Sequence, residues 1–517
     1  MQYILAYDIG TTGMKTCLFQ IADTISLVSS ASKEYDLFLL PDGGAEQDPA
    51  QWWDAMATTT AKLLARTQLS PSQIAGISFS SQMQGVVLVD EKGNALRRAI
   101  SYLDQRAKAE LEAGIAHGFQ IAGANIWKLL PSLRITGAVS SSVKDPLWKY
   151  KWVEAHEPEV FARTHKWLDV KEYIIGKCTG HLIMTEDSAY ATFLYDSRPG
   201  KKTWSEKLCR LFGVTPQHLP SIVAVHDQVG TLTQEAAGHL GLSAGTPVFG
   251  GGGDASMIGI GSGCVETGDT HIYMGTSGWV STIVDQQMVD TSSMMAAIVG
   301  AIPGKYNYFA EMETAGKALA WVKNGLALEE VGDQYQRLGE TLASVPVGAG
   351  GVLFAPWLHG NRCPFEDPRA TAMFLGVTLE TGKPELVRAV VEGICYHLRW
   401  MLTRQERKVR TSSVIRFSGG GALSDGISQI LADVTGRTIE VVENPQNVGA
   451  AGAATTVAVG LGAISSLSAI KGLVPVAKTF HPDPVRHQQY APYYDVFQQL
   501  YKANRKLFAA MPAPQAK

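Results

Sequence analysis

The sequence has few cysteines, and they are not arranged as metal ligands. Its 517 residues include six cysteines, spread from Cys17 to Cys395, and no two of them form a C-x-x-C pair. In so large a chain this pattern argues against a disulfide framework and a cysteine-rich zinc site, so we expect reduced, mostly buried thiols. The twelve histidines also show no spacing typical of a metal site.

An excess of one charge sign and a long apolar run are both missing. Lys plus Arg is 45 and Asp plus Glu is 48, a net charge of -3. We therefore expect neither nucleic acid nor an anionic membrane as a partner. The N-terminus lacks the pattern of a signal peptide. The stretch Val448–Ile464 contains four glycines and two threonines, so a packed, buried helix is expected there rather than a membrane span. These features predict a soluble cytoplasmic protein.

The two commonest nucleotide-binding motifs are absent as well. None of the Gly-Lys pairs has the upstream frame of a Walker A motif. No G-x-G-x-x-G joins a predicted strand to a predicted helix, which disfavours a dinucleotide-dependent dehydrogenase.

What the sequence does contain is typical of a large α/β protein. Hydrophobic residues make up 45%, charged residues 18%, and there are 52 glycines. Predicted strands such as Ile74–Ser80 alternate with predicted helices, one of which begins at Asp48-Pro49 with Asp48 as a helix cap. The length suggests two to four domains.

Two similar hairpins indicate an internal repeat. The strand Gln2–Tyr7 leads into Asp8-Ile9-Gly10-Thr11-Thr12-Gly13 and a second strand. Further along, His271–Met274 leads into Gly275-Thr276-Ser277-Gly278 and another strand. Two such hairpins suggest halves with related folds. We predict an N-terminal domain over residues 1–245 and a C-terminal domain over residues 246–517.

The turns of these hairpins are candidate phosphate sites. Backbone N–H groups and hydroxyls of Gly10, Thr11 and Thr12 would form an anion-binding nest. Asp8, beside that nest, is a candidate Mg²⁺ anchor acting through water, and Lys15 could place a positive charge on a terminal phosphate. The alternative for the first turn is an ordinary tight hairpin whose Asp8 accepts turn hydrogen bonds.

Two further clusters follow predicted strands. Gly419-Gly420-Gly421, with Ser424, precedes a predicted helix over Gly426–Thr435 and could bring backbone against a nucleotide. The alternative is close packing of that helix on its strand. Asp254 follows four consecutive glycines at a strand end, where a carboxylate can face a ligand crevice or cap a helix.

These residues together carry a family resemblance. The chain resembles the FGGY carbohydrate kinases of the actin-like ATPase superfamily, and the xylulose kinase branch most. The resemblance extends from Tyr7 to about Gly462. The matching segments are Asp8–Lys15, Glu46–Pro49, Gln82-Met83, Asp104–Arg106, Gly252–Ala255, Met274–Ser277, Pro356–Arg362, Ala372–Glu392 and Gly419–Gly421.

The resemblance implies an α/β fold with two actin-like (RNase H-like) domains and an interdomain cleft in which ATP and a sugar meet. It implies that Asp254 is the catalytic base and that Asp8 organises Mg²⁺. The ATP-binding residues it implies are Gly10, Thr11, Thr12, Lys15, Gly275, Thr276, Ser277, Gly419, Gly420, Gly421 and Ser424. It also implies a sugar site at Gln82, Met83, Gln84 and Asp254.

Two departures from the family pattern bear on the substrate. Gln84 stands where xylulose kinases typically have His, and Asn361 stands where Glu is usual. The expected activity is ATP-dependent phosphorylation of a sugar, with a ketopentose such as xylulose as the leading substrate. A glycerol-like polyol or a gluconate-like sugar acid is the first alternative, and an actin- or chaperone-like nucleotide switch is the second. A small-molecule sugar is the expected partner, and a homodimer is left open.

Overall fold

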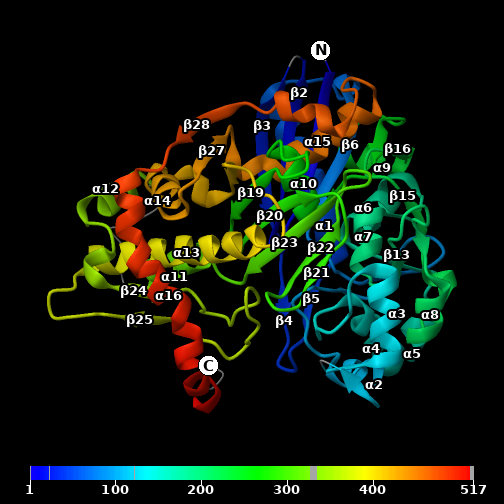
Figure 1. The fold of residues 1–517 in the computed structure, drawn as a ribbon. Coiled ribbons are helices and arrows are strands. Elements are labelled where there is room, and N and C mark those ends of the chain that lie inside the picture. Colours follow the sequence, from blue (N-terminus) through cyan, green and yellow to red (C-terminus); the bar gives the residue numbers. More distant parts are fainter. Residues whose placement is uncertain (1, 23, 122, 326–334, 513–517) are drawn as a thin grey trace. The chain divides into compact units, whose positions relative to one another are not determined.

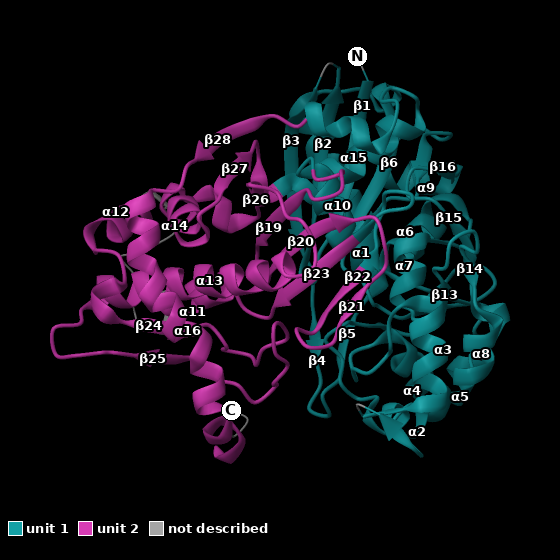
Figure 2. Ribbon diagram, viewed as in Figure 1, with its two compact units in different colours: residues 1–263, 298–306, 447–473 teal, residues 264–297, 307–446, 474–517 magenta. Residues whose placement is uncertain are grey.

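The computed structural model describes residues 2–22, 24–121, 123–325 and 335–512. The chain divides into two compact units (Figure 2). Unit 1 contains residues 1–263, 298–306 and 447–473, and unit 2 contains residues 264–297, 307–446 and 474–517. Each unit mixes helices and strands around a sheet of its own (Figure 1). The predicted division into residues 1–245 and 246–517 stays a prediction.

The sheet of unit 1 has the order β16-β17-β6-β1-β2-β3, and a short strand, β18, continues beside β6. β1 and β2 form the predicted hairpin, and β1 runs parallel to β6. The bounds are β1 Gln2–Ile9, β2 Gly13–Ile21, β3 Ile25–Glu34, β6 Ile74–Ser81, β16 Gln228–Thr231, β17 Pro247–Phe249 and β18 Gly252–Gly253.

Alternate residues of this sheet face different helices, as the pleat of a strand requires. On one face, the hydroxyl of Tyr7 lies 2.8 Å from that of Thr60 on helix α1 (Pro49–Thr67). On the other face, Ser78 lies 2.8 Å from Thr456 on helix α15 (Val448–Gly460). The side chain of Asp8 follows Tyr7 and shares the α15 face, because successive side chains of a strand alternate.

Helix α15 is the buried, small-residue helix predicted from the sequence, and it packs against α10 (Asp254–Gly261). Glycines make this close approach possible. A Cβ at Gly452 would lie 2.0 Å from the carbonyl oxygen of Met257, and one at Gly261 would lie 1.9 Å from that of Val448. The backbones of the two helices are therefore in direct contact.

The strand expected to end before Asp254 is interrupted in the structure. β17 ends at Phe249 and β18 begins at Gly252. Between them, Gly251 has a φ of +61°, and a Cβ there would lie 2.1 Å from the carbonyl oxygen of Phe79. Only glycine fits this position, because a side chain would meet backbone and the conformation is left-handed.

The sheet of unit 2 repeats the arrangement of unit 1. It contains the run β20-β19-β26-β27-β28, in which β19 and β20 form the second predicted hairpin and β19 runs parallel to β26. The corresponding run of unit 1 is β2-β1-β6, which confirms two halves with related folds. The bounds are β19 Thr270–Met274, β20 Gly278–Val284, β26 Val414–Ser418, β27 Thr438–Val442 and β28 Val476–Phe480.

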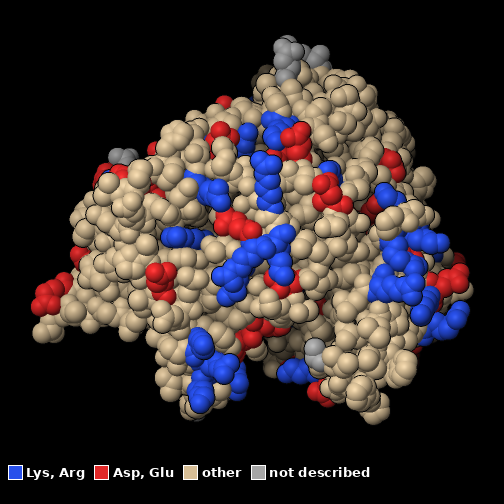
Figure 3. Space-filling view, viewed as in Figure 1, with Lys and Arg blue, Asp and Glu red and all other residues tan. Residues whose placement is uncertain are grey.

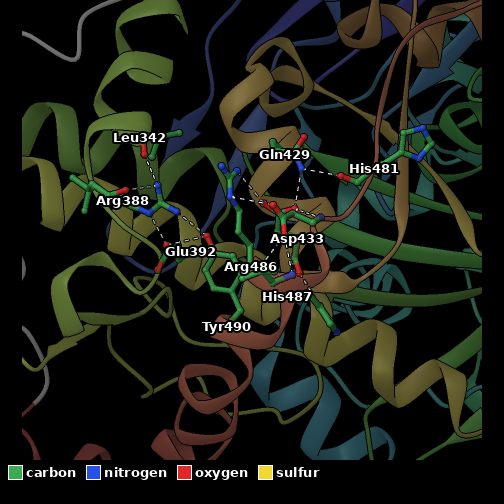
Figure 4. A network of polar contacts seen from close by, with 12 residues as sticks. Leu342, Arg388, Glu392, Gln429, Asp433, His481, Arg486, His487 and Tyr490 are labelled. Atoms are coloured by element: carbon green, nitrogen blue, oxygen red, sulfur yellow. Dashed lines mark hydrogen bonds and ion pairs between the residues drawn. The ribbon is translucent and has the colours of Figure 1, made fainter.

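Buried ionic contacts fix the C-terminal helix of unit 2, α16 (Pro484–Ala510), against α13 (Lys383–Glu406) (Figure 4). Arg388 donates to Glu392 at 2.7 Å and to the hydroxyl of Tyr490 at 2.8 Å. The Tyr490 hydroxyl in turn lies 3.1 Å from Glu392. A second group in the same view joins α16 to α14 (Asp425–Thr435), where His487 bonds to the carbonyl oxygen of Asp433.

The remaining elements complete the two units around these sheets. The other helices are α2 Lys108–Gly114, α3 Ile126–Thr136, α4 Pro146–His156, α5 Pro158–Ala162, α6 Val170–Thr179, α7 Glu186–Ala191, α8 Glu206–Phe212, α9 Gln234–Leu240, α11 Gly316–Gly325 and α12 Tyr335–Ser344. The other strands are β4 Phe38–Leu39, β5 Ala45–Gln47, β7 Val87–Val89, β8 Ala99–Ile100, β9 Gln120–Ile121, β10 Ala124–Asn125, β11 Lys166–Leu168, β12 Ile183–Thr185, β13 Tyr195–Asp196, β14 Thr203–Trp204, β15 Ser221–Val223, β21 Val289–Asp290, β22 Met295–Val299, β23 Tyr306–Met312, β24 Leu353–Ala355 and β25 Met373–Leu375.

The cysteines and the cap of α1 agree with the sequence analysis. All six cysteines are buried and free, as predicted. Asp48 caps α1 by accepting from the N–H of Ala50 at 2.9 Å. Within the described ranges, no helix combines the length and the apolar character that crossing a bilayer requires. On the face shown in Figure 3, acidic and basic side chains are interspersed.

Candidate functional site

In unit 1, the predicted residues gather where three neighbouring parallel strands end. Asp8 at the end of β1 is in register with Ser80 on β6, and Gly252 on β18 is in register with the same Ser80. The segments that follow β6 and β18 carry Gln82 and Asp254. Because adjacent strands lie about 4.8 Å apart, strands two apart place their ends roughly 10 Å from each other. This is the edge at which ligands bind in open α/β sheets.

The turn of the first hairpin is held from outside. The N–H of Gly10 donates to the carbonyl oxygen of Gly13 at 2.9 Å. The carbonyl oxygens of the turn are then taken up by neighbours: Gln47 donates to that of Thr11 at 2.6 Å, and Tyr35 donates to that of Gly10 at 2.5 Å. These contacts fix the shape of the turn, and its role as an anion nest stays a prediction.

Asp8 is partly buried and lies opposite Lys15 in the first hairpin. Burial raises the pKa of its carboxyl group above the ordinary value, while Lys15, directly opposite on β2, opposes that shift. The start of α15 also lies close, since a Cβ at Gly449 would be 3.4 Å from a carboxylate oxygen of Asp8. The positive end of the helix dipole favours a negative charge there.

Asp8 could anchor a magnesium ion whose remaining ligands are water and phosphate oxygens. Within the described residues, no cluster of three or more His, Cys, Asp or Glu side chains is placed to hold a metal. Mg²⁺ usually keeps several waters and takes one or two protein carboxylates together with phosphate oxygens. A partly buried carboxylate at the end of β1 is compatible with that mode of binding, and the role of Asp8 as a Mg²⁺ anchor stays a prediction.

The segment Gln82–Gln84 leaves β6 and is tied to its neighbours. The N–H of Gln82 donates to the carbonyl oxygen of Ile9 at 2.9 Å, and its side-chain nitrogen donates to Gln47 at 3.0 Å. Its side-chain oxygen is buried and has no hydrogen-bond partner among the residues that the structure describes. A buried acceptor of this kind costs free energy unless a ligand or water satisfies it.

Gln84 lies in a left-handed conformation, with a φ of +65°. Two buried charged residues hold it there. Lys149 donates to the carbonyl oxygen of Gln84 at 2.8 Å, and Asp169 accepts from the N–H of Gln84 at 2.8 Å and of Gly85 at 2.9 Å. Burial lowers the pKa of Lys149 to about 8 and, with the nearby Glu172, raises the pKa of Asp169 to about 7.

Asp254 is the first residue of α10, and the helix cap is Gly253 rather than Asp254. The alternative that Asp254 caps the helix is therefore wrong in its strict form. Its carboxylate does accept from the N–H of Ala255 at 2.8 Å. The preceding glycine is packed against the predicted sugar segment, because a Cβ at Gly253 would lie 2.1 Å from the sulfur of Met83.

Asp187 fixes the backbone just before Asp254. It is almost fully buried at the start of α7 and accepts from the N–H of Gly253 at 2.8 Å. Its other oxygen accepts from the hydroxyl of Thr185 at 2.6 Å and from the N–H of Ser188 at 2.9 Å. The carboxylate thereby joins the end of β18 to α7.

In unit 2, the structure brings the other two predicted loops together. The turn Gly275–Ser277 follows β19 and is tied to the start of α11, where the N–H of Gly316 donates to the carbonyl oxygen of Gly275 at 2.8 Å. The loop Gly419–Gly421 packs on the end of the same strand. A Cβ at Gly421 would lie 2.4 Å from the sulfur of Met274, and Gly419 has a φ of +91°.

Ser424 has a structural task in this loop. It is buried and is the cap of α14, accepting from the N–H of Ile427 at 3.3 Å. The glycine loop thus enters the helix directly, so the close-packing alternative holds as a structural fact. A role of these residues in binding ATP stays a prediction.

Two other segments that match the family have structural contacts. Asn361 is buried and donates to the carbonyl oxygens of Cys363 at 3.0 Å and Phe365 at 2.8 Å, which shapes its own loop. In the segment Ala372–Glu392, Glu385 accepts from the N–H of Gly382 at the start of α13.

Sequence reasoning missed the residues that support the site from behind, namely Lys149, Asp169 and Asp187. Each acts on the backbone of a residue 65 or more positions away. No local pattern marks such contacts. A usable signal existed only for Asp169, which stands between Leu168 and Val170, an apolar context that is unusual for a carboxylate.

Comparison with known proteins agrees with this geometry. Residues 3–261 match the N-terminal domain of the FGGY family of carbohydrate kinases, and residues 271–461 match its C-terminal domain. The chain belongs to the FGGY family of carbohydrate kinases. It is a sugar kinase with the actin-like ATPase fold, so the nucleotide-switch alternative is set aside.

Individual relatives cover nearly the whole chain. A xylulose kinase from Staphylococcus epidermidis is 29% identical over 509 residues, which is 98% of this chain and 98% of that protein. A gluconokinase from Bacillus subtilis is 27% identical over 494 residues, 93% of this chain and 92% of that protein. The crystal structure of ligand-bound xylulose kinase from Lactobacillus acidophilus has a TM-score of 0.86 at 26% identity and covers 99% of this chain and 100% of that chain.

Proposed function

We propose that this carbohydrate kinase transfers the γ-phosphoryl group of ATP to a primary hydroxyl of a ketopentose such as xylulose. The observation that carries the proposal is the adjacency of Met83 and Gly253. It puts the segment that carries Gln82 and Gln84 next to the residue preceding Asp254. A polar segment suited to sugar hydroxyls and a carboxylate suited to take up their proton are then neighbours. The full-length similarity to xylulose kinases supports the choice of sugar.

In this proposal Asp254 is the general base. As the oxygen of the sugar hydroxyl forms its bond to the γ-phosphorus, the bond from that phosphorus to the bridging oxygen breaks and ADP leaves. The hydroxyl proton passes to the carboxylate of Asp254. The buried, unpaired side-chain oxygen of Gln82 accepts from another sugar hydroxyl, and Gln84 offers an amide donor and acceptor to the same substrate.

Three loops supply the proposed nucleotide contacts. Backbone N–H groups of Thr11 and Thr12, with the ammonium of Lys15, stabilise charge on the moving phosphoryl group, and the N–H of Gly10 closes the turn by donating to Gly13. Residues Gly275, Thr276 and Ser277 do the same from the second hairpin. The loop Gly419–Gly421, with Ser424 at its end, provides backbone against the adenosine part.

We assign Asp8 as the protein anchor of Mg²⁺. The bound ion would supply neutralisation of the β- and γ-phosphate oxygens. The part of Asp8 is to stay ionised and to orient the ligands of the ion, for which Lys15 and the start of α15 both favour the charged form. We place the reaction in the cytoplasm, where ATP is available and thiols such as those buried here stay reduced.

A sugar acid such as gluconate is the second candidate substrate. Gln84 replaces the imidazole usual in xylulose kinases, and a gluconokinase aligns over 93% of the chain. An amide can bond to hydroxyls or to a carboxylate, so this position alone allows both substrates.

A substrate panel tests the proposal. ADP release by the full-length protein with Mg-ATP is measured with xylulose, ribulose, glycerol and gluconate, each against a blank without acceptor. We expect stimulation by the ketopentose well above that by glycerol. Stimulation by gluconate alone would replace the proposed substrate with the second candidate, and the absence of any stimulation would contradict both.

A further inference from the structure

Behind the proposed sugar and base residues of unit 1 lies a buried set of charged side chains that take no direct part in the proposed reaction. Lys171 and Glu172 on α6 are fully buried and form an ion pair. Lys171 also donates to the hydroxyls of Thr185 at 2.6 Å and Ser188 at 2.7 Å. Removing such charges from water costs several kcal/mol per ion, and pairing offsets this cost only where the geometry is good. We therefore asked which neighbouring groups these charged side chains hold in place.

One part of this set contacts β18, the strand that directly precedes Asp254. Thr185 accepts from Lys171, so its single hydroxyl proton is free to bond to Asp187 at 2.6 Å. Asp187 then uses its second oxygen for the N–H of Gly253 at 2.8 Å. A Cβ at Gly252 would lie 2.8 Å from that same oxygen, so backbone and carboxylate are in close contact.

The other part reaches the segment that carries Gln84. Asp169 is the cap of α6, the helix that begins with Val170 and carries Lys171 and Glu172. One carboxylate oxygen of Asp169 accepts hydrogen bonds from the N–H groups of Gly85 and Val170. The other oxygen accepts one from the N–H of Gln84. A non-glycine residue keeps a left-handed conformation only where neighbouring groups stabilise it. For Gln84 these groups are the carboxylate of Asp169 and the ammonium of Lys149.

We propose that Asp187 and Asp169 are positioning residues, which hold the base Asp254 and the sugar-contacting Gln84 respectively, and that Lys171 orients Asp187 through the hydroxyl of Thr185. This inference rests on the proposed function. It assigns separate effects to the two carboxylates, because each holds a different backbone segment.

The variants Asp187→Asn and Asp169→Asn test this division. In each, an amide NH₂ replaces one oxygen and faces a backbone or side-chain donor, so the hydrogen-bond set cannot be satisfied. A misplacement of about 1 Å can cost roughly 10²-fold in rate. For Asp187→Asn we expect kcat to fall by about 10- to 100-fold with the KM for sugar changed by less than about 3-fold. For Asp169→Asn we expect mainly a raised KM for sugar and weaker discrimination between sugars.

Asp433→Asn is the matched control. Asp433 is a buried carboxylate of unit 2 (Figure 4) that accepts from Gln429 and from the N–H of Asp483, each at 2.8 Å. We expect it to lower the thermal unfolding midpoint without changing kcat or the KM for sugar. Thr185→Val, which removes the hydroxyl between Lys171 and Asp187, serves if Asp187→Asn does not fold, and we expect it to lower kcat in the same direction.

The outcomes separate this inference from the proposed function. If Asp254→Asn abolishes sugar-stimulated ADP release while folded Asp187→Asn and Thr185→Val keep normal kcat, the positioning role is wrong and the proposed function stands. If kcat and KM change alike in Asp187→Asn, Asp169→Asn and Asp433→Asn, the effect is general destabilisation and the inference is overturned. If Asp254→Asn is fully active, the proposed function itself fails.

Discussion

At the scale of single residues, buried polar groups are satisfied by partners far away in the sequence. Gln84 holds a left-handed backbone conformation without being glycine, which costs about 1–3 kcal/mol. The bonds from Lys149 and Asp169 offset that cost. Asp8 shows the same dependence, because its charge is favoured by Lys15 from β2 and by the start of α15.

His397 is a residue at which burial has a measurable consequence. Its Nε2–H donates to the carbonyl oxygen of Cys363 at 2.8 Å, and its Nδ1 accepts from Trp357 at 3.3 Å, which fixes the neutral form. Burial lowers its pKa to about 4. A histidine with a lowered pKa contributes stability that is fully present above its unfolded pKa of about 6.5 and is lost as the pH falls through the folded value.

We therefore expect the free energy of unfolding of the protein to fall between pH 6.5 and pH 4. His397→Gln cannot take up a proton, so its loss over that range should be smaller by roughly 3 kcal/mol. Urea unfolding followed by tryptophan fluorescence at both pH values measures the difference. Equal losses in the two proteins would show that His397 is not held neutral.

At the scale of elements, the hairpins and the buried helix α15 were predictable, because Gly/Thr turns and runs of small residues are local signals. The break between β17 and β18 was not, because it depends on contact of Gly251 with the backbone of Phe79. The family-like segment ending at Glu392 was recognised by its residues, but its structural task was not. Glu392 lies buried against Arg388 and Tyr490.

The ion pair between Arg388 and Glu392 should respond differently to single and double replacement. Burial raises the pKa of Glu392, and Arg388 opposes that shift. Arg388→Met leaves a buried carboxylate without its cation, so we expect a loss of about 3–5 kcal/mol in the free energy of unfolding. The double variant R388M/E392L should recover most of that loss. A double variant no more stable than Arg388→Met would contradict this account of α13.

The contact between α10 and α15 gives a prediction about packing. Gly452→Ala places a Cβ where the carbonyl oxygen of Met257 lies 2.0 Å away, and overpacking of this kind costs about 1–3 kcal/mol. Because α10 begins at Asp254, we also expect a lower kcat. Gly238→Ala on α9 is the matched control, since a Cβ there meets nothing within 4 Å. Equal unfolding free energies for the two variants would refute a backbone contact between the helices.

At the scale of the whole molecule, each of the two units is built from three separate segments of the chain. Residues 447–473, which contain α15, group with unit 1 although the chain has by then passed through most of unit 2. Sequence reasoning predicted two related halves from the paired hairpins, but it could not predict this return, which depends on long-range packing. The supporting carboxylates Asp169 and Asp187 were missed for the same reason.

This organisation predicts separate footprints for the two substrates. Hydrogen exchange measured with sugar alone should slow in residues 82–85 and 252–255 of unit 1. With a non-hydrolysable ATP analogue alone it should slow in residues 275–277 and 419–421 of unit 2 and in residues 11–12 of unit 1. A buried polar pairing with a ligand is what protects these amides from exchange. Protection of residues 419–421 by sugar alone, without nucleotide, would contradict the assignment of that loop.

The most direct test of the central claim is the turnover number of Asp254→Asn. The variant keeps the shape of the side chain and removes its ability to take up a proton, so kcat should fall by about 10²- to 10⁴-fold or more. Sugar affinity measured by calorimetry and the thermal midpoint should stay close to those of the unaltered protein. A folded variant that phosphorylates the sugar at a near-normal rate would show that Asp254 is not the base.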